Sequence, residues 1–420
     1  MNDIFEKCST NGGYFGDFRS SGDRYFTMPV MESVPGKIMK FQGKDCLMWS
    51  INNYLGLAEN EQIKNEAVEA AKVWGSSGPM GSRMMSGNTE EHLRLEEALA
   101  DFSQKESSIL FNYGYLGVIG TVSSIVGPDD IIIMDKLVHA SIVDAALGAV
   151  SDKKHIRVFR HNDMTSLEKR LISAREKTKG GVLILTEGVY GMTGDVARLD
   201  DISTLKDKYG ARLFVDDAHG VGVMGANGRG TAEHFGVQDK IDLYFGTFAK
   251  AFAAIGGYTA ATNEAVEWIR YNARTQVFAK SLPMIYVKAL QKTLELVQDG
   301  KSRREKLFDI AEKLSTGLRA LGYYIGNVKS PLVPVFIPEG NPVIAMEWIT
   351  YLRNKGIFVT GVTYPVIPKN YIMFRMVPTA AHTDADVERT IEAFKNLRDD
   401  RKIPLNYDIA AISNIYGDAQ

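Results

Sequence analysis

Apolar residues between positions 107 and 298 follow two alternating patterns along the chain. Short runs of Ile, Val, Leu and Phe predict buried strands, and they are separated by stretches with helical period. Strands of this kind, joined by helices, predict a mostly parallel seven-stranded sheet covered on both faces. We predict strands at 108–111, 131–134, 156–159, 182–186, 213–216, 243–246 and 258–262, and helices from about 115, 140, 163 and 199 and over 264–275 and 283–298.

The flanking segments have different patterns, which predict further units around this α/β region. Residues 37–51 have the alternation of a hairpin, and 60–74 have the period of a helix that ends at Gly75. A second helix after Asn88 or Thr89 carries an apolar stripe. The members of that stripe are Leu93, Leu95, Leu99 and Phe102.

We expect three parts: an N-terminal arm and hairpin over 1–55, a large domain over 56–298 and a small C-terminal domain over 299–420. Strands near 332–337 and 371–376 with helices around them give the small domain an α+β pattern. The hairpin is expected to complete that domain. Residues 1 to about 30 contain many aromatic side chains, including those of 14–18 and 23–26, so we expect an arm that packs on other parts of the protein.

Composition narrows the class of protein. The chain has 420 residues, of which 45% are hydrophobic and 24% charged, as in ordinary globular proteins. A formal net charge of −2 gives no electrostatic reason to expect a nucleic acid partner. The two cysteines, Cys8 and Cys46, indicate neither a disulfide framework nor a metal site. The first residues lack a signal-peptide pattern, and no apolar run is long enough to be an integral membrane segment, so we expect a cytoplasmic protein.

Two strand ends carry the residues with the clearest chemistry. Lys250 follows the predicted strand 243–246, and Asp216 ends the strand 213–216, three residues before His219. A lysine at such a place is either an ordinary solvated residue or one held for chemistry, such as a Schiff base. Pyridoxal phosphate (PLP) needs a lysine for its aldehyde and a carboxylate for its pyridine nitrogen. The carboxyl ends of neighbouring strands would bring these two groups together.

Other residues at the same predicted edge of the sheet could serve a cofactor. Gly114 and Tyr115 open a helix, where free backbone N–H groups can bind phosphate, and Thr247 is a second phosphate candidate. Packing is the alternative for the glycine. His139 could stack on a pyridine ring or could simply cap its helix. By contrast, His155 and His161 flank a strand, and we expect both to be solvated, with no metal role.

Arg375 is a single arginine in the apolar run 372–377. A guanidinium can hold a carboxylate through two hydrogen bonds. Because its own strand offers no acid, a substrate carboxylate is a candidate partner.

Taken in order, the motifs resemble those of the α-oxoamine synthases, a family of PLP enzymes of fold type I, over about 37–400. Such a resemblance implies a large domain with a seven-stranded sheet and a smaller α+β domain. The motifs are Asn52-Asn-Tyr-Leu-Gly-Leu, Gly81-Ser-Arg followed by Ser-Gly-Asn, His139-Ala-Ser, Thr186-Glu187-Gly-Val-Tyr followed by Gly-Asp195, Asp216-Asp-Ala-His219-Gly, Gly-Arg-Gly230, Thr247-Phe-Ala-Lys250, and Arg375 followed by Ala-Ala-His-Thr.

The resemblance also implies roles for individual residues. Lys250 would carry PLP and remove the α-proton of an amino acid, while Asp216 pairs with the ring nitrogen. His219 would bind the phenolic oxygen and His139 would stack on the ring, and both would help to polarise the incoming carbonyl. The remaining residues expected in the site are Gly114, Tyr115, Thr247, Glu187 and Ser281 for the cofactor, and Asn52, Arg375 and Arg83 for the substrate.

The family further implies a decarboxylating condensation of an amino acid with an acyl thioester, in a homodimer with shared active sites. The segment 278–283 would reach the neighbouring subunit's phosphate. The sequence after Lys250 is closer to the long-chain-base branch, so we expect serine or cysteate as the amino acid, as in sphingolipid or sulfonolipid synthesis. Acyl-CoA and acyl carrier protein are both possible donors. Arg83 is the candidate cation for the second anion of cysteate.

Three alternatives stay open at this point: a short-chain synthase that uses glycine or alanine, an aminotransferase of the same fold, and a non-catalytic subunit, which would commonly lack the lysine. The chain also departs from the family pattern at several positions. Gly191 and Thr193 replace a serine and an aspartate, and Lys280 could add a charge near a phosphate. Tyr113 and Val118 could reshape the substrate pocket.

Overall fold

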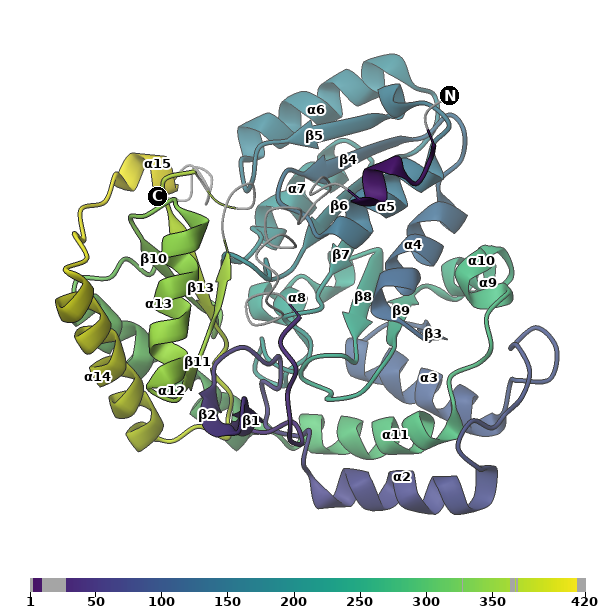
Figure 1. Ribbon diagram of the computed structural model, residues 1–420. Coiled ribbons are helices and arrows are strands. Elements are labelled where there is room, and N and C mark those ends of the chain that lie inside the picture. The colour runs from purple at the N-terminus through teal and green to yellow at the C-terminus, as the bar shows by residue number, and fades with distance from the viewer. Residues whose placement is uncertain (1–2, 10–27, 327, 363–366, 368, 414–420) are drawn as a thin grey trace.

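The computed structural model describes residues 3–9, 28–326, 328–362, 367 and 369–413. A large sheet with helices on both sides forms one part, and a smaller group of strands and helices lies beside it (Figure 1). Most of the predicted packing arm, residues 1 to about 30, lies outside the described residues, including both of its aromatic stretches, 14–18 and 23–26. In the described ranges, no helix combines the length and the apolar character that crossing a membrane requires.

The large sheet has seven strands in the order β3-β9-β8-β7-β6-β4-β5. Strand β9 is antiparallel to both neighbours, and the other pairs are parallel, as the sequence predicts. The strands are β3 (Ser107–Phe111), β4 (Ile131–Asp135), β5 (Ile156–Phe159), β6 (Val182–Glu187), β7 (Arg212–Asp216), β8 (Leu243–Thr247) and β9 (Gly257–Ala261).

Side chains along one strand enter separate cores on the two faces of this sheet. In β4, Ile131 and Ile133 join one apolar cluster and Ile132 and Met134 the other, as the two-residue period of a strand requires. One face is covered by α4 (Gly114–Ile125), α5 (Ala140–Ala149), α9 (Asn263–Asn272) and α10 (Arg274–Val277). The other is covered by α3 (Glu90–Ser103), α6 (Met164–Lys177), α7 (Leu199–Lys208), α8 (Thr231–Phe235) and α11 (Met284–Gln298).

Helix α2 (Glu61–Trp74) lies along α11 at the base of the molecule (Figure 1). Both ends of α2 lie at residues whose side chains or conformations favour a helix end. The Asn60 side chain accepts hydrogen bonds from the N–H groups of Gln62 and Ile63, and the helix ends at Gly75, whose φ of 68° favours glycine. The predicted helix over 264–275 is instead two helices, because α9 ends at Asn272 and α10 follows it.

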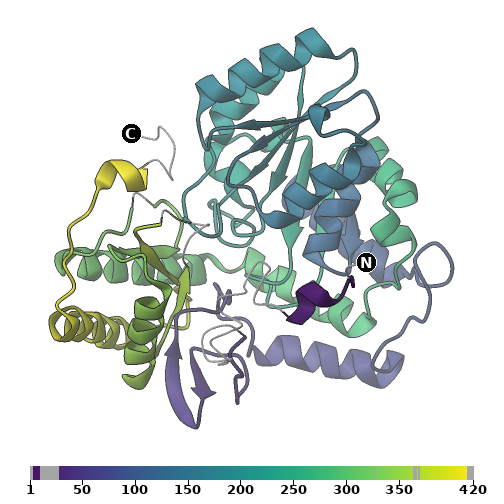
Figure 2. The ribbon, with the colours of Figure 1, turned by 45° about the horizontal axis from the view of Figure 1, so that its top comes forward.

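Two three-stranded sheets and their helices form the small part of the molecule (Figure 2). Its core contains Leu47 and Trp49 of the N-terminal segment together with side chains from 310–403. The sheets are β10-β13-β12 and β1-β2-β11. The strands are β1 (Ile38–Phe41), β2 (Lys44–Met48), β10 (Val333–Ile337), β11 (Ile357–Phe358), β12 (Thr360–Val362) and β13 (Ile372–Met376). The helices are α12 (Lys301–Ala320), α13 (Pro342–Asn354), α14 (Asp384–Arg401) and α15 (Ile409–Ser413).

The N-terminal hairpin joins the C-terminal part through a parallel pairing of β2 with β11, in which Leu47 lies opposite Ile357. Trp49 continues this contact, since its indole N–H donates to the Thr390 hydroxyl (3.0 Å) and its ring stacks on His382. The predicted role of the hairpin is therefore confirmed. The short strands β11 and β12 were not predicted, because two or three residues carry too little periodicity. The exact domain boundaries stay a prediction.

Candidate functional site

A cavity of about 750 Å³ lies at the carboxyl ends of the central strands. In a parallel sheet these ends meet at one edge, where ligands of open α/β folds bind. The wall also includes residues of the small domain. Ten of the predicted site residues line this cavity: Asn52, Gly114, Tyr115, His139, Glu187, Asp216, His219, Thr247, Lys250 and Arg375.

Two buried carboxyl groups stand side by side on neighbouring strands, since Glu187 of β6 lies opposite Asp216 of β7. Burial raises the pKa of Asp216 to about 6, although the nearby Lys250 charge opposes this. Burial and the Asp216 charge also raise the pKa of Glu187. The Ala218 N–H donates to Asp216 Oδ1 (3.1 Å). Because burial disfavours the ionised form of Asp216, a nearby cation helps to keep it ionised at neutral pH. Lys250 or the protonated pyridine nitrogen of a cofactor can supply that cation.

Lys250 stands in a turn held by the core. Phe248, Ala251 and Phe252 around it are fully buried, and the Ala254 N–H donates to the Phe248 carbonyl (2.8 Å). Burial lowers the pKa of the Lys250 amine, while Asp216 and Glu187 work in the opposite direction. A desolvated ammonium gives up its proton more easily than a solvated one, so more of the lysine is the free amine, the form that acts as nucleophile or base.

His139 fits both of its predicted roles. It is the N-cap of α5, where its Nδ1 accepts a hydrogen bond from the Ser141 N–H (3.2 Å), and the ring is open to the cavity. The surrounding protein lowers the pKa of His139, and the Lys250 charge adds to this effect. Since Nδ1 is an acceptor, the neutral ring carries its proton on Nε2. The ring is thereby fixed in both orientation and tautomer.

His219 faces the cavity from the loop after β7, and its Nδ1 lies 2.8 Å from the Tyr54 hydroxyl. Burial lowers the pKa of His219 and raises the pKa of Tyr54 to about 12, so both groups are neutral at pH 7. A Cβ added at Gly191 would lie 2.2 Å from His219 Nε2. Glycine at 191, a departure from the family pattern, therefore leaves space for the imidazole. Tyr54 lies within the motif that begins at Asn52 but had no predicted role.

Arg375 brings a cation from strand β13 of the small domain to the cavity. Its Nε donates to the Gly191 carbonyl, and Nη2 donates to Asn52 Oδ1 (3.3 Å). Asn52 follows β2, so both residues come from the part of the molecule that the hairpin completes. Burial lowers the pKa of Arg375, yet guanidinium stays charged at any physiological pH. Both of these acceptors are neutral oxygens, so the guanidinium keeps a charge that suits an incoming carboxylate.

The predicted phosphate ligands lie together at one end of this cavity. Gly114 is the first residue of α4, whose leading N–H groups lack helical partners. A Cβ at Gly114 would lie 2.8 Å from Thr247 Oγ1, so the absence of a side chain keeps this corner open. The Tyr115 hydroxyl donates to Asp144. A helix N-terminus and a hydroxyl can bind a phosphate.

Arg83 and Ser281 are not brought into this cavity. Arg83 forms a buried ion pair with Glu96, and it also donates to Asn88 Oδ1. The Ser281 hydroxyl donates to the Gly81 carbonyl (3.0 Å). Arg83, Lys280 and Ser281 line a separate small cavity. Within one chain, Arg83 lies outside this cavity and is paired with Glu96, which also contacts Arg270 (3.3 Å), so a substrate role for Arg83 stays a prediction.

The structure also corrects the prediction for His161, which is 4% exposed rather than solvated. Its ring lies between Asp135 and Asp195. Nothing in the local sequence signals this burial, because the two acids come from distant segments. Within the described ranges, no group of three or more His, Cys, Asp and Glu side chains is arranged to hold a metal ion.

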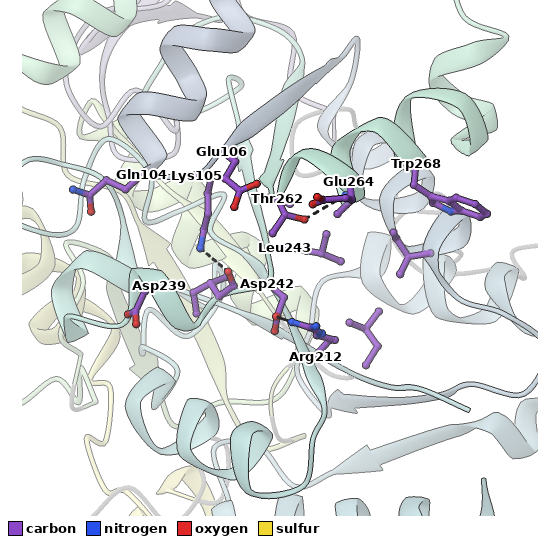
Figure 3. Close-up of a pocket in the computed structure, with 15 residues that line it drawn as sticks. Gln104, Lys105, Glu106, Arg212, Asp239, Asp242, Leu243, Thr262, Glu264 and Trp268 are labelled. Carbon is purple, nitrogen blue, oxygen red and sulfur yellow. Dashed lines mark hydrogen bonds and ion pairs between the residues drawn. The ribbon is translucent and has the colours of Figure 1, made fainter. Parts of the chain in front are cut away.

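A second cavity, of about 720 Å³, lies at the opposite edge of the sheet, by the amino ends of β7 and β8 (Figure 3). Its charged groups bind other parts of the protein. Arg212 donates to Asp242 Oδ1 (2.6 Å), and Lys105 donates to the Ile241 carbonyl (2.6 Å). None of the predicted site residues lines it. The cavity at the carboxyl ends is therefore the candidate active site.

Known proteins resemble this chain over most of its length. The family model "Aminotransferase class I and II" matches residues 44–394. A cysteate-C-fatty acyltransferase from Capnocytophaga ochracea is 44% identical over 403 residues, which cover 95% of each chain. An 8-amino-7-oxononanoate synthase from Thermoanaerobacter pseudethanolicus is 36% identical over 373 residues, 89% of this chain and 93% of that one.

Solved structures agree with these sequence matches. A variant of serine palmitoyltransferase from S. paucimobilis, with PLP and myriocin bound, matches with a TM-score of 0.87 and 30% identity, over 95% of this chain and 99% of that one. Similarity at this level over nearly the full length shows that this chain belongs to the class I and II aminotransferase family and, within it, to the α-oxoamine synthases that its motifs resemble.

Proposed function

We propose that this protein joins cysteate or serine to a long-chain acyl thioester with the help of PLP. In the overall reaction a carbon–carbon bond forms between the amino acid's α-carbon and the acyl carbonyl, the thiol leaves, and carbon dioxide is lost. The product is a 3-oxo amino lipid base. The observation that carries the proposal is the meeting of Lys250, Asp216 and Arg375 in one cavity of a chain 44% identical to a cysteate acyltransferase.

The cavity suits PLP in three separate respects. Asp216 is a buried acid that would pair with the pyridine nitrogen, and Lys250 is a partly desolvated amine beside it. The open corner at Gly114 and Thr247 would hold the phosphate. When bound, PLP supplies an electron sink that stabilises negative charge on the α-carbon of an amino acid. His139 and His219, both neutral, would orient the ring and donate to its oxygen and to the incoming carbonyl.

The chain's own residues would divide the remaining work between binding and proton transfer. Arg375 and Asn52 would hold the carboxylate of the amino acid, which fixes the α-carbon in the cavity. Lys250 Nζ would then take the proton from that α-carbon. Its lowered pKa increases the fraction of free amine at neutral pH, as a general base requires.

Cysteate carries a sulfonate in addition to its carboxylate, and this second anion needs a cation. Since Arg83 is paired with Glu96, the proposal must find that cation elsewhere. Among the described residues that line the cavity, the Lys and Arg side chains are Lys136, Lys250 and Arg375. Lys136 is exposed at the wall, in the turn between β4 and His139. We therefore propose Lys136 as the contact for a sulfonate.

We further propose a homodimer in which the loops around 80 and 280 of one subunit approach the cavity of the other. Met80, Met85 and Phe278 expose 79%, 83% and 74% of their surface, and exposed apolar side chains that gather on two paired loops suit an interface. Ser82 pairs with Lys280, so the two loops form one surface. Ser281, which lies outside its own cavity, would act on the partner's phosphate. The cytoplasmic location expected from the sequence stays a prediction.

Purified holoenzyme tests the proposal. We expect thioester-dependent release of carbon dioxide when cysteate or serine is supplied with palmitoyl-CoA, and little with glycine or alanine. Exclusive use of glycine or alanine with short acyl-CoA would favour the 8-amino-7-oxononanoate synthase-like alternative. Conversion of the amino acid without any thioester would indicate an aminotransferase instead. No reaction in any arm, with PLP bound, would contradict the proposed activity.

A further inference from the structure

His161 is a buried ionisable group that the proposed reaction does not use. Its Nδ1 lies 2.8 Å from Asp135 Oδ1 and its Nε2 lies 2.6 Å from Asp195 Oδ2. Asp135 is 1% and Asp195 7% exposed. We call these three residues the Asp135–His161–Asp195 cluster. Burying three ionisable groups is costly, so a compensating benefit is expected where they are found.

The hydrogen bonds of the cluster determine its charge. Ionised carboxylates only accept hydrogen bonds, so both ring nitrogens of His161 must donate, and the ring is an imidazolium. Burial lowers the pKa of His161, but the bonds to Asp135 and Asp195 outweigh burial and raise it to about 10. The Asn162 N–H donates to the second oxygen of Asp135, Oδ2, and Asn162 Nδ2 donates to Asp195 Oδ2, the oxygen that His161 also contacts (both 3.0 Å). The other oxygen of Asp195, Oδ1, accepts from the Thr193 hydroxyl.

Each acid of the cluster also holds one wall of the active-site cavity. Asp135 ends β4 and its Oδ1 accepts from the Leu137 N–H (2.8 Å), which fixes the turn leading to His139. Asp195 lies in the loop of residues 190–195, where the Tyr190 N–H donates to its backbone carbonyl (2.9 Å). The edge of the Tyr190 ring also packs on His161, with centroids 4.4 Å apart.

The loop of residues 190–195 contacts the proposed carboxylate site directly. Gly191, Met192 and Thr193 line the cavity, and the Gly191 carbonyl accepts the hydrogen bond from Arg375 Nε. A shift of this loop would therefore move the acceptor that orients the guanidinium. His161 does not itself line the cavity, so any effect it has must pass through the loop of residues 190–195 or through the turn that Asp135 holds.

We infer that the Asp135–His161–Asp195 cluster is a positioning device, which clamps the loop of residues 190–195 to the turn before His139 and thereby holds Arg375 in place for the carboxylate of the amino acid. His161 is a positioning residue in this scheme and not a catalytic one. The part of the inference that concerns the carboxylate rests on the proposed function. The part that concerns the clamp does not.

The test compares His161→Gln, which can donate to only one of the two acids from a given rotamer, with His155→Gln as a matched control. His155 lies at the other end of β5, and its Nδ1 bonds to the Asp130 carbonyl, away from the cavity. In the holoenzyme, titration of cysteate and serine, followed by cofactor absorbance, gives the dissociation constant. We expect His161→Gln to weaken amino acid binding about tenfold or more, since small displacements at a binding site have effects of this size. Saturating turnover should change much less.

Hydrogen–deuterium exchange supplies a readout that does not depend on activity. We expect faster exchange of amides in 190–197 in His161→Gln but not in His155→Gln, with exchange in β7 and β8 unchanged. If His161→Gln does not fold, Asp195→Asn replaces it in both measurements. This variant keeps an oxygen that can accept a hydrogen bond from the His161 ring. Unchanged exchange in 190–197 in the folded variant would overturn the clamp. Faster exchange with unchanged amino acid affinity would overturn the link to Arg375. If the wild type fails to respond to amino acids at all, the proposed function is wrong, while the exchange data still decide the clamp.

Discussion

Gly191 lies where a side chain would meet the active-site imidazole, and Gly191→Ala tests that contact. The added Cβ would stand 2.2 Å from His219 Nε2, whereas ordinary contacts begin at 3.4 Å, so the ring or the loop must move by about 3.4 − 2.2 = 1.2 Å. The ring cannot turn freely, because Tyr54 holds Nδ1 at 2.8 Å and the residue is buried.

Overpacking of this kind costs about 1–3 kcal/mol. If the variant still folds and the cost falls on the catalytic geometry, kcat/KM for the amino acid should decrease between about 5-fold and 150-fold. The assay is thioester-dependent carbon dioxide release at saturating PLP, together with the amino acid dissociation constant from cofactor absorbance. Gly191→Ala should both lower kcat/KM and weaken amino acid binding, because the Gly191 carbonyl also orients Arg375.

Gly148→Ala provides a matched control in the same molecule. Gly148 lies in α5 and a Cβ there would have no heavy atom within 4 Å. The substitution should leave activity unchanged and stabilise the helix by about 0.5–1 kcal/mol, as Gly→Ala does inside a helix. If Gly191→Ala keeps wild-type kcat/KM and stability, the His219 ring does not need the space that glycine leaves. Glycine at 191 would then have no role in placing the imidazole.

Three further predictions follow from the site and the buried cluster. Lys250→Ala should lower kcat by about 10²–10⁴-fold and let PLP dialyse away, measured by turnover and by absorbance, whereas retained turnover would exclude the lysine as the base. Lys136→Ala should raise KM for cysteate about tenfold and change KM for serine less than about twofold, since a charge-assisted contact contributes about 1.5 kcal/mol or more. An equal effect on both amino acids would argue against a sulfonate contact. The pKa of His161 is about 10 in the folded protein and about 6.5 in the unfolded chain. Protonation of His161 therefore adds at most about 5 kcal/mol to the free energy of unfolding. This contribution is present in full below pH 6.5 and is lost progressively as the pH rises to 10. Urea unfolding of wild type and His161→Gln should therefore differ most near pH 6 and converge towards pH 10, and a constant difference would contradict the imidazolium.

Local pattern was sufficient to predict the strands of the large sheet and the chemistry at their ends. Fully apolar runs such as 131–134 of β4 have no exposed face, so they indicate strands buried between helix layers. Lys250 and Asp216 could be paired from the sequence alone because parallel strands place their carboxyl ends at one edge. His139 could be placed near them for the same reason, although its cap on α5 and its ring tautomer depend on hydrogen bonds that only the folded chain defines.

Contacts between distant segments could not be derived from the sequence. Arg83 looks like a free cation in its glycine-rich loop, yet it is buried against Glu96 on α3, which also contacts Arg270. His161 looks solvated beside β5, yet acids from β4 and from the loop of residues 190–195 enclose it. In each case a charged residue acquires its partner only through tertiary packing, and single-chain periodicity says nothing about that partner.

The parallel pairing of β2 with β11 has a consequence for how the protein is made. One strand of that pair leaves the ribosome near the beginning of synthesis and the other near its end. The seven-stranded sheet uses residues 107–261 only, so it can form while the chain is still growing. The sheet β1-β2-β11 must wait for completion, because β2 has only β1 as a partner until β11 emerges in the last quarter of the polypeptide. Asn52 follows β2, and Arg375 lies in β13, which is also made in the last quarter, so a nascent chain would acquire its lysine pocket before it could retain an amino acid.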